Sequence, residues 1–575
     1  MTRSRARRAS VPSSLPRFTR LTLWLIPWLF LASVELVLRL TPIAAPPRYF
    51  LEERSGDRIF LRSNPRIGER FFPKSLGAII PAPNSQVFAL QKPPGLKRVL
   101  CLGESTTAGF PFPVHGGFPA LLEQILGERA GAGATRWEVV NCGLTGISSQ
   151  VVAELMPDYL QAKPDLFVIY LGHNEFYGVG GVIGSSPLTD VLGALRRLRM
   201  YRVLESAVAG TSAAGSDDKN TEKKPGTLME RLAERSVVSP GDPARLRAEQ
   251  RFEKHLESIL RAADRAGVPV LLCELVSNEK DLYPFGSSSD PAQSAAVAFT
   301  SGDYRAARNL DTVPFRAPDG MNEVLREAAT KSAAQATGTT TTASASVRFV
   351  ELDSVFRSAS DAERTLGRES FTEHLHPNFA GNARIAATVA SAIVDEPHAS
   401  APTRDDLARW WRGSDLTRID LAFADARLAQ LHGRWPYKRE GIDAPPAPYR
   451  FPPTLDDARS LLAAAGDSIG AARLATPSPR EPEYLTALVQ KRATIFDIHR
   501  ALTRELAAAG DLEGARRELR AALRLYPVDD RIWMELAELA RRDGALDEAR
   551  WAARSALSWN PGAISAREFL ATIGG

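Results

Sequence analysis

The sequence predicts an α/β domain built on a parallel β-sheet, preceded by an apolar helix and followed by a helical repeat region. Three observations lead to this prediction. Strand-like and helix-like stretches alternate between residues 96 and 395, residues 21–40 are almost entirely apolar, and features near the C-terminus recur 34 residues apart. With 575 residues, 44% of them hydrophobic and 24% charged, the chain is long enough for two or three globular domains.

The α/β domain is predicted from its alternation of strand and helix patterns. Short apolar runs are typical of parallel strands that are covered on both faces. The expected strands are residues 97–102, 137–141, 165–171, 268–275 and 347–352. The expected helices are residues 120–128, 148–161, 243–266 and 378–394. This order predicts a three-layer α/β fold, in which helices cover both faces of a parallel sheet.

The remaining segments are assigned by composition. Residues 41–95 are expected to be a linker or N-terminal extension, and residues 396–496 a linker and helical region. Residues 211–226 and 336–346 are polar or of low complexity, which predicts surface loops. Residues 178–242 have no counterpart in a minimal α/β domain, so we expect an insertion there, either a lid or an unstructured decoration.

The apolar run at residues 21–40 predicts a transmembrane helix, because about 20 helical residues span the hydrocarbon layer of roughly 30 Å. Residues 1–20 contain six arginines and no acidic residue. The positive-inside rule therefore predicts a cytoplasmic N-terminus and an extracytoplasmic body, in the periplasm or at the cell surface. Glu35 and Arg39 would share one face of this helix. A signal peptide cleaved near Ala45 is the alternative, and it would export the same body.

Charge and cysteine usage narrow the class of protein. Removing the six N-terminal arginines from the net charge of +5 leaves −1, so the body is near neutral and nothing indicates a nucleic-acid-binding surface. The three cysteines, Cys101, Cys142 and Cys273, lie in or beside apolar runs and form no CxxC pair. We therefore expect buried free thiols, and we expect neither a metal nor a cofactor.

Sequence features near the C-terminus keep a period of 34 residues. The matching pairs are Gly510 and Gly544, Ala515 and Ala549, Ala522 and Ala556, Leu523 and Leu557, and Pro527 and Pro561. This helix–turn–helix period resembles the tetratricopeptide repeat over residues 497–575. Because only two repeats are clear, helical sequence at 454–474 and 484–496 is expected to supply further packing. The resemblance implies a protein partner for residues 497–575.

Four short motifs lie where a parallel α/β fold places its sites, after successive strands or before the last helix. They are Gly103-Glu104-Ser105, Asn141-Cys142-Gly143, Gly172-His173-Asn174-Glu175 and Glu373-His374-Leu375-His376. Taken together, they resemble the four blocks of the SGNH/GDSL hydrolase family, which is named for a Ser, a Gly, an Asn and a His. The first block reads GES where the family name has GDS, so Glu104 replaces the usual Asp.

The resemblance implies a role for one or two residues in each block. Ser105 matches the nucleophile and His376 the base. Glu373 takes the place of the Asp that usually precedes this histidine by three residues. The backbone N–H groups of Ser105 and Gly143 and the side-chain amide of Asn174 match the oxyanion hole.

The chemistry of these residue types agrees with such roles. A serine hydroxyl needs a base to remove its proton, and an imidazole with a pKa near about 6.5 suits this task. A carboxylate on the other imidazole nitrogen fixes the tautomer, and hydrogen-bond donors stabilise the tetrahedral intermediate. We therefore expect a membrane-anchored serine esterase or acylhydrolase that forms an acyl-enzyme. The resemblance to the family implies small esters, acylated glycans or lipids as its substrates.

Other interpretations stay open. The same site could transfer an acyl group to a glycan hydroxyl, or the chain could be a non-catalytic scaffold that binds proteins through its repeats. Ser105 could only cap a helix, and Gly143 and Asn174 could only serve turns. His374, His376 and Glu373 could bind a metal, but histidines two residues apart are a poor ligand pair.

Overall fold

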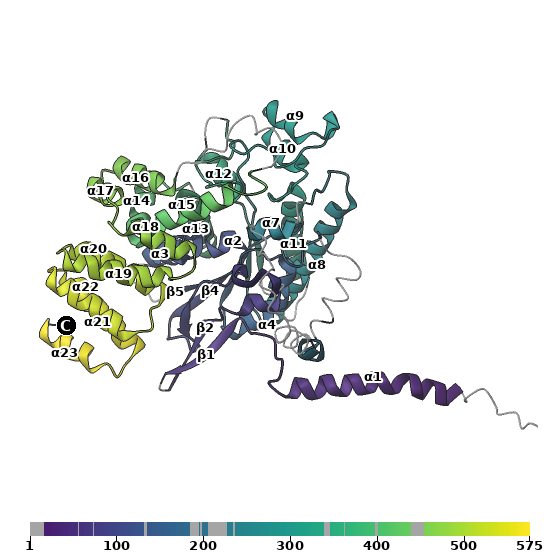
Figure 1. Ribbon diagram of the computed structural model, residues 1–575, viewed down its shortest axis with the longest axis horizontal. Helices are drawn as coiled ribbons and strands as arrows, with labels where there is room; N and C mark the ends of the chain where they lie inside the picture. Colours follow the sequence, from purple (N-terminus) through teal and green to yellow (C-terminus); the bar gives the residue numbers. More distant parts are fainter. Residues whose placement is uncertain are drawn as a thin grey trace, which may run out of the picture. The chain divides into compact units, whose positions relative to one another are not determined.

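The computed structural model describes residues 17–55, 57–72, 74–130, 135–183, 195, 198–204, 227–233, 236–338, 346–360, 363–396, 401–438 and 453–574. The chain divides into two compact units (Figure 1). The N-terminal unit contains Met1–Pro47 and Gly184–Lys224, and the main unit contains Arg48–Ile183 and Pro225–Gly575.

The N-terminal unit contains the helix α1 (Arg17–Leu40), which includes the apolar run of the sequence. Arg39 Nε donates a hydrogen bond of 2.7 Å to Glu35 Oε1, as their spacing predicts. Glu35 also accepts the backbone N–H groups of Arg199 and Met200, at 3.2 and 3.1 Å. This carboxylate therefore connects α1 to the second segment of the same unit.

The transmembrane helix predicted at residues 21–40 is not found. Across the described ranges, no helix combines the length and the apolar character that crossing a membrane requires. Much of the predicted insertion at 178–242, including the loop predicted at 211–226, lies outside the described residues, as does most of the loop predicted at 336–346.

The main unit is built on a five-stranded parallel sheet of order β5-β4-β6-β7-β8. Its strands are β4 (Leu96–Gly103), β5 (Arg136–Gly143), β6 (Leu166–Tyr170), β7 (Val270–Cys273) and β8 (Val347–Val350). All five predicted strands are confirmed, each within two residues at either end. Numbered along the chain, the order is 2-1-3-4-5, the flavodoxin-like order.

Two groups of helices cover this sheet. In one group α3 (Phe118–Ala130) packs against α13 (Phe379–Ile393). In the other, α8 (Pro243–Arg265) packs between α4 (Ser149–Gln161) and α11 (Asp319–Gly338). Figure 1 shows α3 and α13 to the left of the strands and α8 and α11 to the right. The four helices predicted in this region are confirmed, and the sequence analysis assigned no helix to α11.

Shorter helices connect these elements. They are α2 (Ser105–Ala108), α7 (Leu228–Ala233), α9 (Ala295–Thr300), α10 (Tyr304–Leu310) and α12 (Asp353–Ser358), with 3-10 turns η1 (Ile67–Arg70), η2 (Lys74–Ile79), η3 (Val114–Gly116) and η4 (Pro291–Gln293). The three cysteines are free and buried, as predicted. They lie on β4, β5 and β7, where the sheet is covered on both faces.

The segment predicted to be a linker at residues 41–95 contains a small antiparallel sheet. Its strands are β1 (Phe50–Ser55), β2 (Arg58–Ser63) and β3 (Val87–Ala89), paired in the order β1-β2-β3. Four apolar residues of this sheet are buried, namely Phe50, Phe60, Leu61 and Phe88. The sequence analysis expected a linker or N-terminal extension here and assigned no strand to it, because charged residues dilute the apolar pattern of these short strands.

Among its described residues, the C-terminal part contains helices joined by turns and no strand. After α14 (Arg404–Gly413) and α15 (Arg418–His432) come α16 (Thr454–Ala464), α17 (Ser468–Ala475) and α18 (Glu481–Val489). Two helical hairpins follow, α19 (Ile495–Ala508) with α20 (Leu512–Leu525) and α21 (Asp530–Arg542) with α22 (Leu546–Trp559), and then α23 (Ile564–Thr572).

The 34-residue period of the sequence has a direct structural counterpart. The helices α20 and α22 begin 34 residues apart, and Ala515, Ala522, Ala549 and Ala556 on these helices are all fully buried. Small side chains at these positions allow the paired helices to approach closely. Tyr484 and Leu488 of α18 pack with Ile498 and Leu502 of α19, so helical sequence before the repeats does contribute packing, as predicted.

Candidate active site

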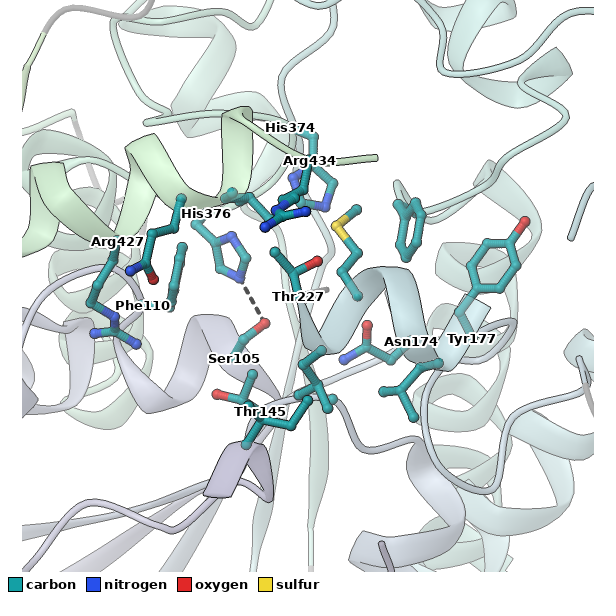
Figure 2. A pocket seen from close by; sticks show the side chains of 18 of the residues that line it. Ser105, Phe110, Thr145, Asn174, Tyr177, Thr227, His374, His376, Arg427 and Arg434 are labelled. Carbon is teal, nitrogen blue, oxygen red and sulfur yellow. Dashed lines mark hydrogen bonds between the residues drawn. The ribbon is translucent and has the colours of Figure 1, made fainter. Parts of the chain in front are cut away.

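Ser105 and His376 meet at the carboxyl edge of the parallel sheet. Ser105 begins α2 directly after β4, and His376 lies in the turn that precedes α13. Ser105 Oγ and His376 Nε2 are 2.7 Å apart (Figure 2). Both residues are only 7% exposed, yet both line a cavity of about 610 Å³. The structure therefore places the serine hydroxyl where an imidazole can accept its proton.

Glu373 continues this chain of contacts on the other side of the imidazole. Its Oε1 atom is hydrogen-bonded to His376 Nδ1 and also accepts the backbone N–H groups of His376, at 2.7 Å, and Leu375, at 3.3 Å. The extra methylene of glutamate, compared with the aspartate usual at this place, does not prevent the contact. A buried carboxylate in this position fixes the imidazole tautomer and orientation.

Tyr437 holds the second oxygen of the same carboxylate. Its hydroxyl donates a hydrogen bond of 2.6 Å to Glu373 Oε2 and lies 2.8 Å from His374 Nδ1, which also contacts Glu373. Sequence reasoning missed Tyr437, because it lies beyond α15 in the segment predicted to be a linker and helical region. No motif marks it.

Asn174 reaches the cavity from the loop after β6. Figure 2 shows its amide nitrogen on the side that faces Ser105. Glu104 fixes this loop, since its carboxylate accepts the backbone N–H groups of Gly172, His173 and Asn174 at 3.1–3.2 Å. The acidic residue beside Ser105 therefore positions the asparagine, a function that the sequence analysis did not assign to it.

Gly143 does not line the cavity, contrary to its predicted place in the oxyanion hole. Its N–H group donates a hydrogen bond of 2.9 Å to Asn141 Oδ1, and a Cβ atom on it would lie 2.2 Å from the backbone nitrogen of Ala108. This glycine therefore allows α2, with Ser105, to lie close against β5. Gly146, three residues later, does line the cavity, at a positive φ of 74°.

Burial shifts the pKa values of several groups near the site. Burial, and then the charge of Arg427, lower the pKa of His376 to about 3. The imidazole is therefore neutral around pH 7 and can accept a proton. Burial, and then the charge of Glu175, raise the pKa of Glu104 to about 8 despite its three N–H donors. Burial also raises the pKa of Glu175 to about 7.

Comparison with protein families agrees with this geometry. Residues 101–384 match the model of the GDSL-like lipase/acylhydrolase family, and residues 496–539 match the tetratricopeptide repeat. Residues 101–384 form a GDSL-like lipase/acylhydrolase domain. The GDSL-like domain makes the protein a hydrolase that acts on esters, as the sequence analysis predicted.

The comparison with solved structures finds proteins that match about half of the chain. They include a GDSL-like lipase from Bacteroides thetaiotaomicron, with 12% identity over 52% of this chain and 88% of that chain and a TM-score of 0.25. The acetyl xylan esterase AlAXEase has 14% identity over 52% and 99%, with a TM-score of 0.28. The SGNH-hydrolase family esterase AlinE4 has 17% identity over 53% and 97%, with a TM-score of 0.22. No curated protein matches the chain.

The walls of the cavity extend beyond the residues of the GDSL-like domain. Ser105, Gly146, Asn174 and His376 lie within the matched range, whereas Arg427, Arg434 and Lys491 come from α15 and from the segments after α15 and α18. The helical region after the GDSL-like domain therefore completes the cavity beside Ser105.

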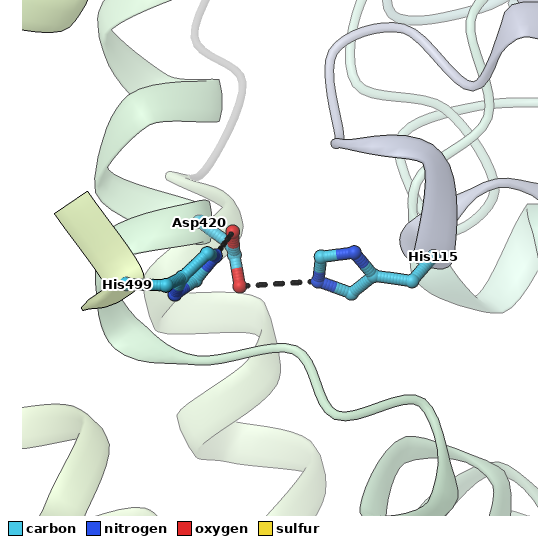
Figure 3. A group of neighbouring side chains, drawn as sticks. All are labelled: His115, Asp420 and His499. Carbon is cyan, nitrogen blue, oxygen red and sulfur yellow. Dashed lines mark hydrogen bonds and ion pairs between the residues drawn. The ribbon is translucent and has the colours of Figure 1, made fainter. Parts of the chain in front are cut away.

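Two groups of described residues bring atoms of metal-binding type within 4.8 Å of one another. Glu373, His374 and His376 form one group, and Glu373 and His376 belong to the series of contacts that ends at Ser105 Oγ. The other group lies outside the cavity and consists of His115, Asp420 and His499 (Figure 3). No sequence motif indicated this second group.

The second group is a buried ionic network. Asp420 lies 3.2 Å from His115 Nε2 and 3.0 Å from His499 Nε2, and Glu518 Oε2 lies 2.6 Å from His499 Nδ1. Burial alone would lower the pKa of His499, but the charges of Asp420 and Glu518 raise it to about 10. A cationic His499 thus connects α15 to the first repeat hairpin, while His115 connects α15 to the GDSL-like domain.

Proposed function

We propose that the protein is a serine esterase in which Ser105 is the nucleophile, His376 the base and Glu373 the carboxylate that orients it. The observation that carries this proposal is the continuous chain of contacts from Ser105 Oγ through both nitrogens of His376 to Glu373. The chain joins a hydroxyl, an imidazole and a carboxylate in the order that serine hydrolases use.

The reaction would proceed through an acyl-enzyme. Ser105 Oγ bonds to the ester carbonyl carbon while its proton moves to His376 Nε2. The C–O bond to the alcohol then breaks, the alkoxide takes the proton from Nε2, and the acyl group stays on Ser105. Water, deprotonated by His376, next attacks the acyl carbon. The tetrahedral intermediate then breaks its bond to Ser105 Oγ, which takes the proton from His376 Nε2, and the carboxylic acid is released.

The carbonyl oxygen carries negative charge in each tetrahedral intermediate and needs hydrogen-bond donors. We assign this function to the backbone N–H groups of Ser105 and Gly146 and to the side-chain amide of Asn174. All three residues line the cavity. Gly146 takes the place that the sequence analysis gave to Gly143, whose N–H is bonded to Asn141.

Labelling with a fluorophosphonate and turnover of small acetyl esters test the assignment. We expect wild type to be labelled and active, and Ser105→Ala and His376→Ala to lose about 10⁴-fold or more in kcat. Ser301→Ala, at an exposed serine, is the control. A folded wild type that neither reacts with the probe nor turns over esters would contradict the proposal. Product analysis with and without a glycan acceptor separates hydrolysis from acyl transfer, which share their first half-reaction.

We also propose that the enzyme acts outside the cytoplasm and binds a protein through its repeats. The six arginines ahead of the apolar run at 21–40 support the location, and the extended surfaces that repeat proteins use for binding support a partner. A reporter fused after Ala45 tests the location, since it should be active only if it is exported. Cross-linking and co-purification of the full chain test the partner.

A further inference from the structure

We propose that the cavity beside Ser105 contains an anion-binding subsite formed by Arg427 and Arg434. The preferred substrates would then be esters whose alcohol part carries a carboxylate, sulfate or phosphate group. This inference rests on the proposed function of Ser105 and deepens it by naming the chemical class of the substrate.

The first observation is the charge of the cavity wall. Arg427, Arg434 and Lys491 line the cavity, and no aspartate or glutamate does so among the described residues. Burial, and then the charge of Arg427, lower the pKa of Lys491, so two of these cations repel each other across the wall. An anion bound between the cations would relieve this repulsion.

The second observation is the environment of Arg427. Its guanidinium lies over the Phe110 ring at 4.5 Å and donates a hydrogen bond of 2.7 Å to the carbonyl oxygen of Pro111. The part of the chain that the structure describes pairs no carboxylate with it. A partly buried guanidinium without a counter-ion is costly, and a bidentate oxyanion is the group that it binds best.

The third observation is the place of Arg427 relative to the base. The Phe110 ring lies between them, with its centroid 4.6 Å from that of His376. In Figure 2, Arg427 lies on the side of Ser105 and His376 away from Tyr177, and Arg434 lies above Ser105, close to His374 and His376. The histidine must deliver its proton to the leaving alcohol, so the alcohol lies on the side of His376. Arg427 is therefore placed to meet the alcohol part of the ester, and Arg434 lines the same cavity near the base.

The opposite part of the cavity fits an acyl group. Leu228 and Leu232 of α7 lie beside Gly146, and the Phe315 ring lies 4.6 Å from that of Tyr177. Apolar side chains of this kind favour a hydrocarbon chain over a charged one. The cavity is thus divided between an apolar acyl side and a cationic alcohol side.

The charge of Arg427 also affects the catalytic base. It disfavours the imidazolium form of His376, which develops when Ser105 loses its proton. An oxyanion on the substrate would neutralise that charge while it is bound. Anionic substrates would therefore gain both in binding and in the basicity of His376, whereas neutral esters would gain in neither.

Paired model substrates test the subsite in the full chain. The neutral ester is 4-acetoxybenzamide, and its anionic counterparts are 4-acetoxybenzoate and 4-acetoxyphenyl phosphate, which separate carboxylate from phosphate recognition. We expect wild type to favour at least one anionic ester by about tenfold or more in kcat/KM. Arg427→Gln and Arg434→Gln should each lower kcat/KM for that ester by about ten- to hundredfold, chiefly through KM, the scale of a hydrogen bond to a charged group.

Two control variants sharpen the test. Arg261→Gln, at an exposed arginine of α8, should leave all three substrates unaffected, and Arg427→Lys should restore part of the preference if charge is what matters. Equal kcat/KM for neutral and anionic esters in wild type, with no effect of Arg434→Gln, would overturn the subsite and leave the esterase proposal standing. No turnover of any ester and no fluorophosphonate labelling would overturn both.

Discussion

Tyr437 donates a hydrogen bond of 2.6 Å to Glu373 Oε2, although the two residues belong to different parts of the chain. Glu373 lies within the GDSL-like domain, whereas Tyr437 follows α15. Because Glu373 is fully buried, its two oxygens depend on the few donors that reach them. The carboxylate that orients His376 is therefore held from outside the domain that carries the catalytic motifs.

Replacement of Tyr437 by Phe should lower kcat by about tenfold with little change in KM. The variant loses one hydrogen bond to a buried charged group, and such a bond contributes about 1.5–3 kcal/mol. Steady-state kinetics and the pH profile of kcat check this, since a purely structural tyrosine would not move the profile. Tyr484→Phe is the matched control, because that hydroxyl donates to Glu505 away from the cavity. Equal kinetics of Tyr437→Phe and wild type would show that Glu373 orients His376 without the hydrogen bond from Tyr437.

Asn174 and Gly143 should respond differently to replacement by Ala. Asn174→Ala removes a proposed oxyanion donor and should cost about 10²- to 10³-fold in kcat with an unchanged melting temperature. Gly143→Ala places a Cβ atom 2.2 Å from the backbone of Ala108, so the variant should lose thermal stability along with activity. Kinetics and thermal unfolding measured side by side separate the two effects. A stable Gly143→Ala variant with a selective loss of kcat would instead return Gly143 to the oxyanion hole.

The parts of the site that could be predicted from sequence are those that local pattern determines. Ser105 and Asn174 follow strands with clear apolar runs, and Glu373 and His376 are close neighbours in one motif. Tyr437 and Arg427 could not be predicted, because their positions depend on how α15 packs against a distant domain. The choice between Gly143 and Gly146 depends on the path of one turn, which residue types alone do not specify.

The fold likewise has elements that could be predicted from local sequence and elements that could not. The strands and helices of the parallel sheet have strong periodicity, and all of those predicted are present. The sheet of β1, β2 and β3 is held by contacts between short strands that interleave charged residues, so its local signal is weak. The link from the repeats to the domain depends on His115, Asp420 and His499, which lie far apart in sequence and had no shared motif.

The burial of Glu104 and Glu175 should destabilise the main unit increasingly as pH rises from about 5 to about 8. In the folded chain the pKa of Glu104 is raised to about 8 and that of Glu175 to about 7, both above the ordinary value of 4.5. At these two groups the folded state then binds more protons than the unfolded state in this range, so their contribution to the free energy of unfolding decreases with pH. Chemical unfolding of wild type and Glu104→Gln at several pH values checks this, because the free energy of unfolding of wild type relative to that of the variant should fall as pH rises. A difference between the two proteins that does not change with pH would contradict the prediction.

His499→Ala should destabilise the main unit by about 3–5 kcal/mol, because it leaves the buried carboxylates of Asp420 and Glu518 without their cation. The folded pKa of His499 is about 10, above its ordinary value of about 6.5. Its contribution is therefore complete below about pH 6.5 and is lost as pH rises toward 10. Chemical unfolding at pH 6 and pH 10 should show a smaller difference from wild type at the higher pH. Arg500→Ala, on the same helix with a partly exposed partner, is the control, and an equal effect of the two variants would refute a special role for the network.

The acid limb of kcat/KM should lie well below pH 6.5, because burial and the charge of Arg427 lower the pKa of His376 to about 3 in the free enzyme. Below that limb the imidazole is protonated and cannot accept the proton of Ser105. Arg427→Gln removes one of the two causes, so its acid limb should move toward the ordinary histidine value of about 6.5. Hydrolysis of a neutral ester, measured from pH 3 to pH 8 in wild type and variant, isolates this effect from anion binding. Arg434→Gln is the matched comparison, because the charge of Arg427, and not that of Arg434, lowers the pKa of His376. An acid limb that stays in place in Arg427→Gln would mean that burial alone determines the pKa of the base, and Arg427 would then act on the substrate only.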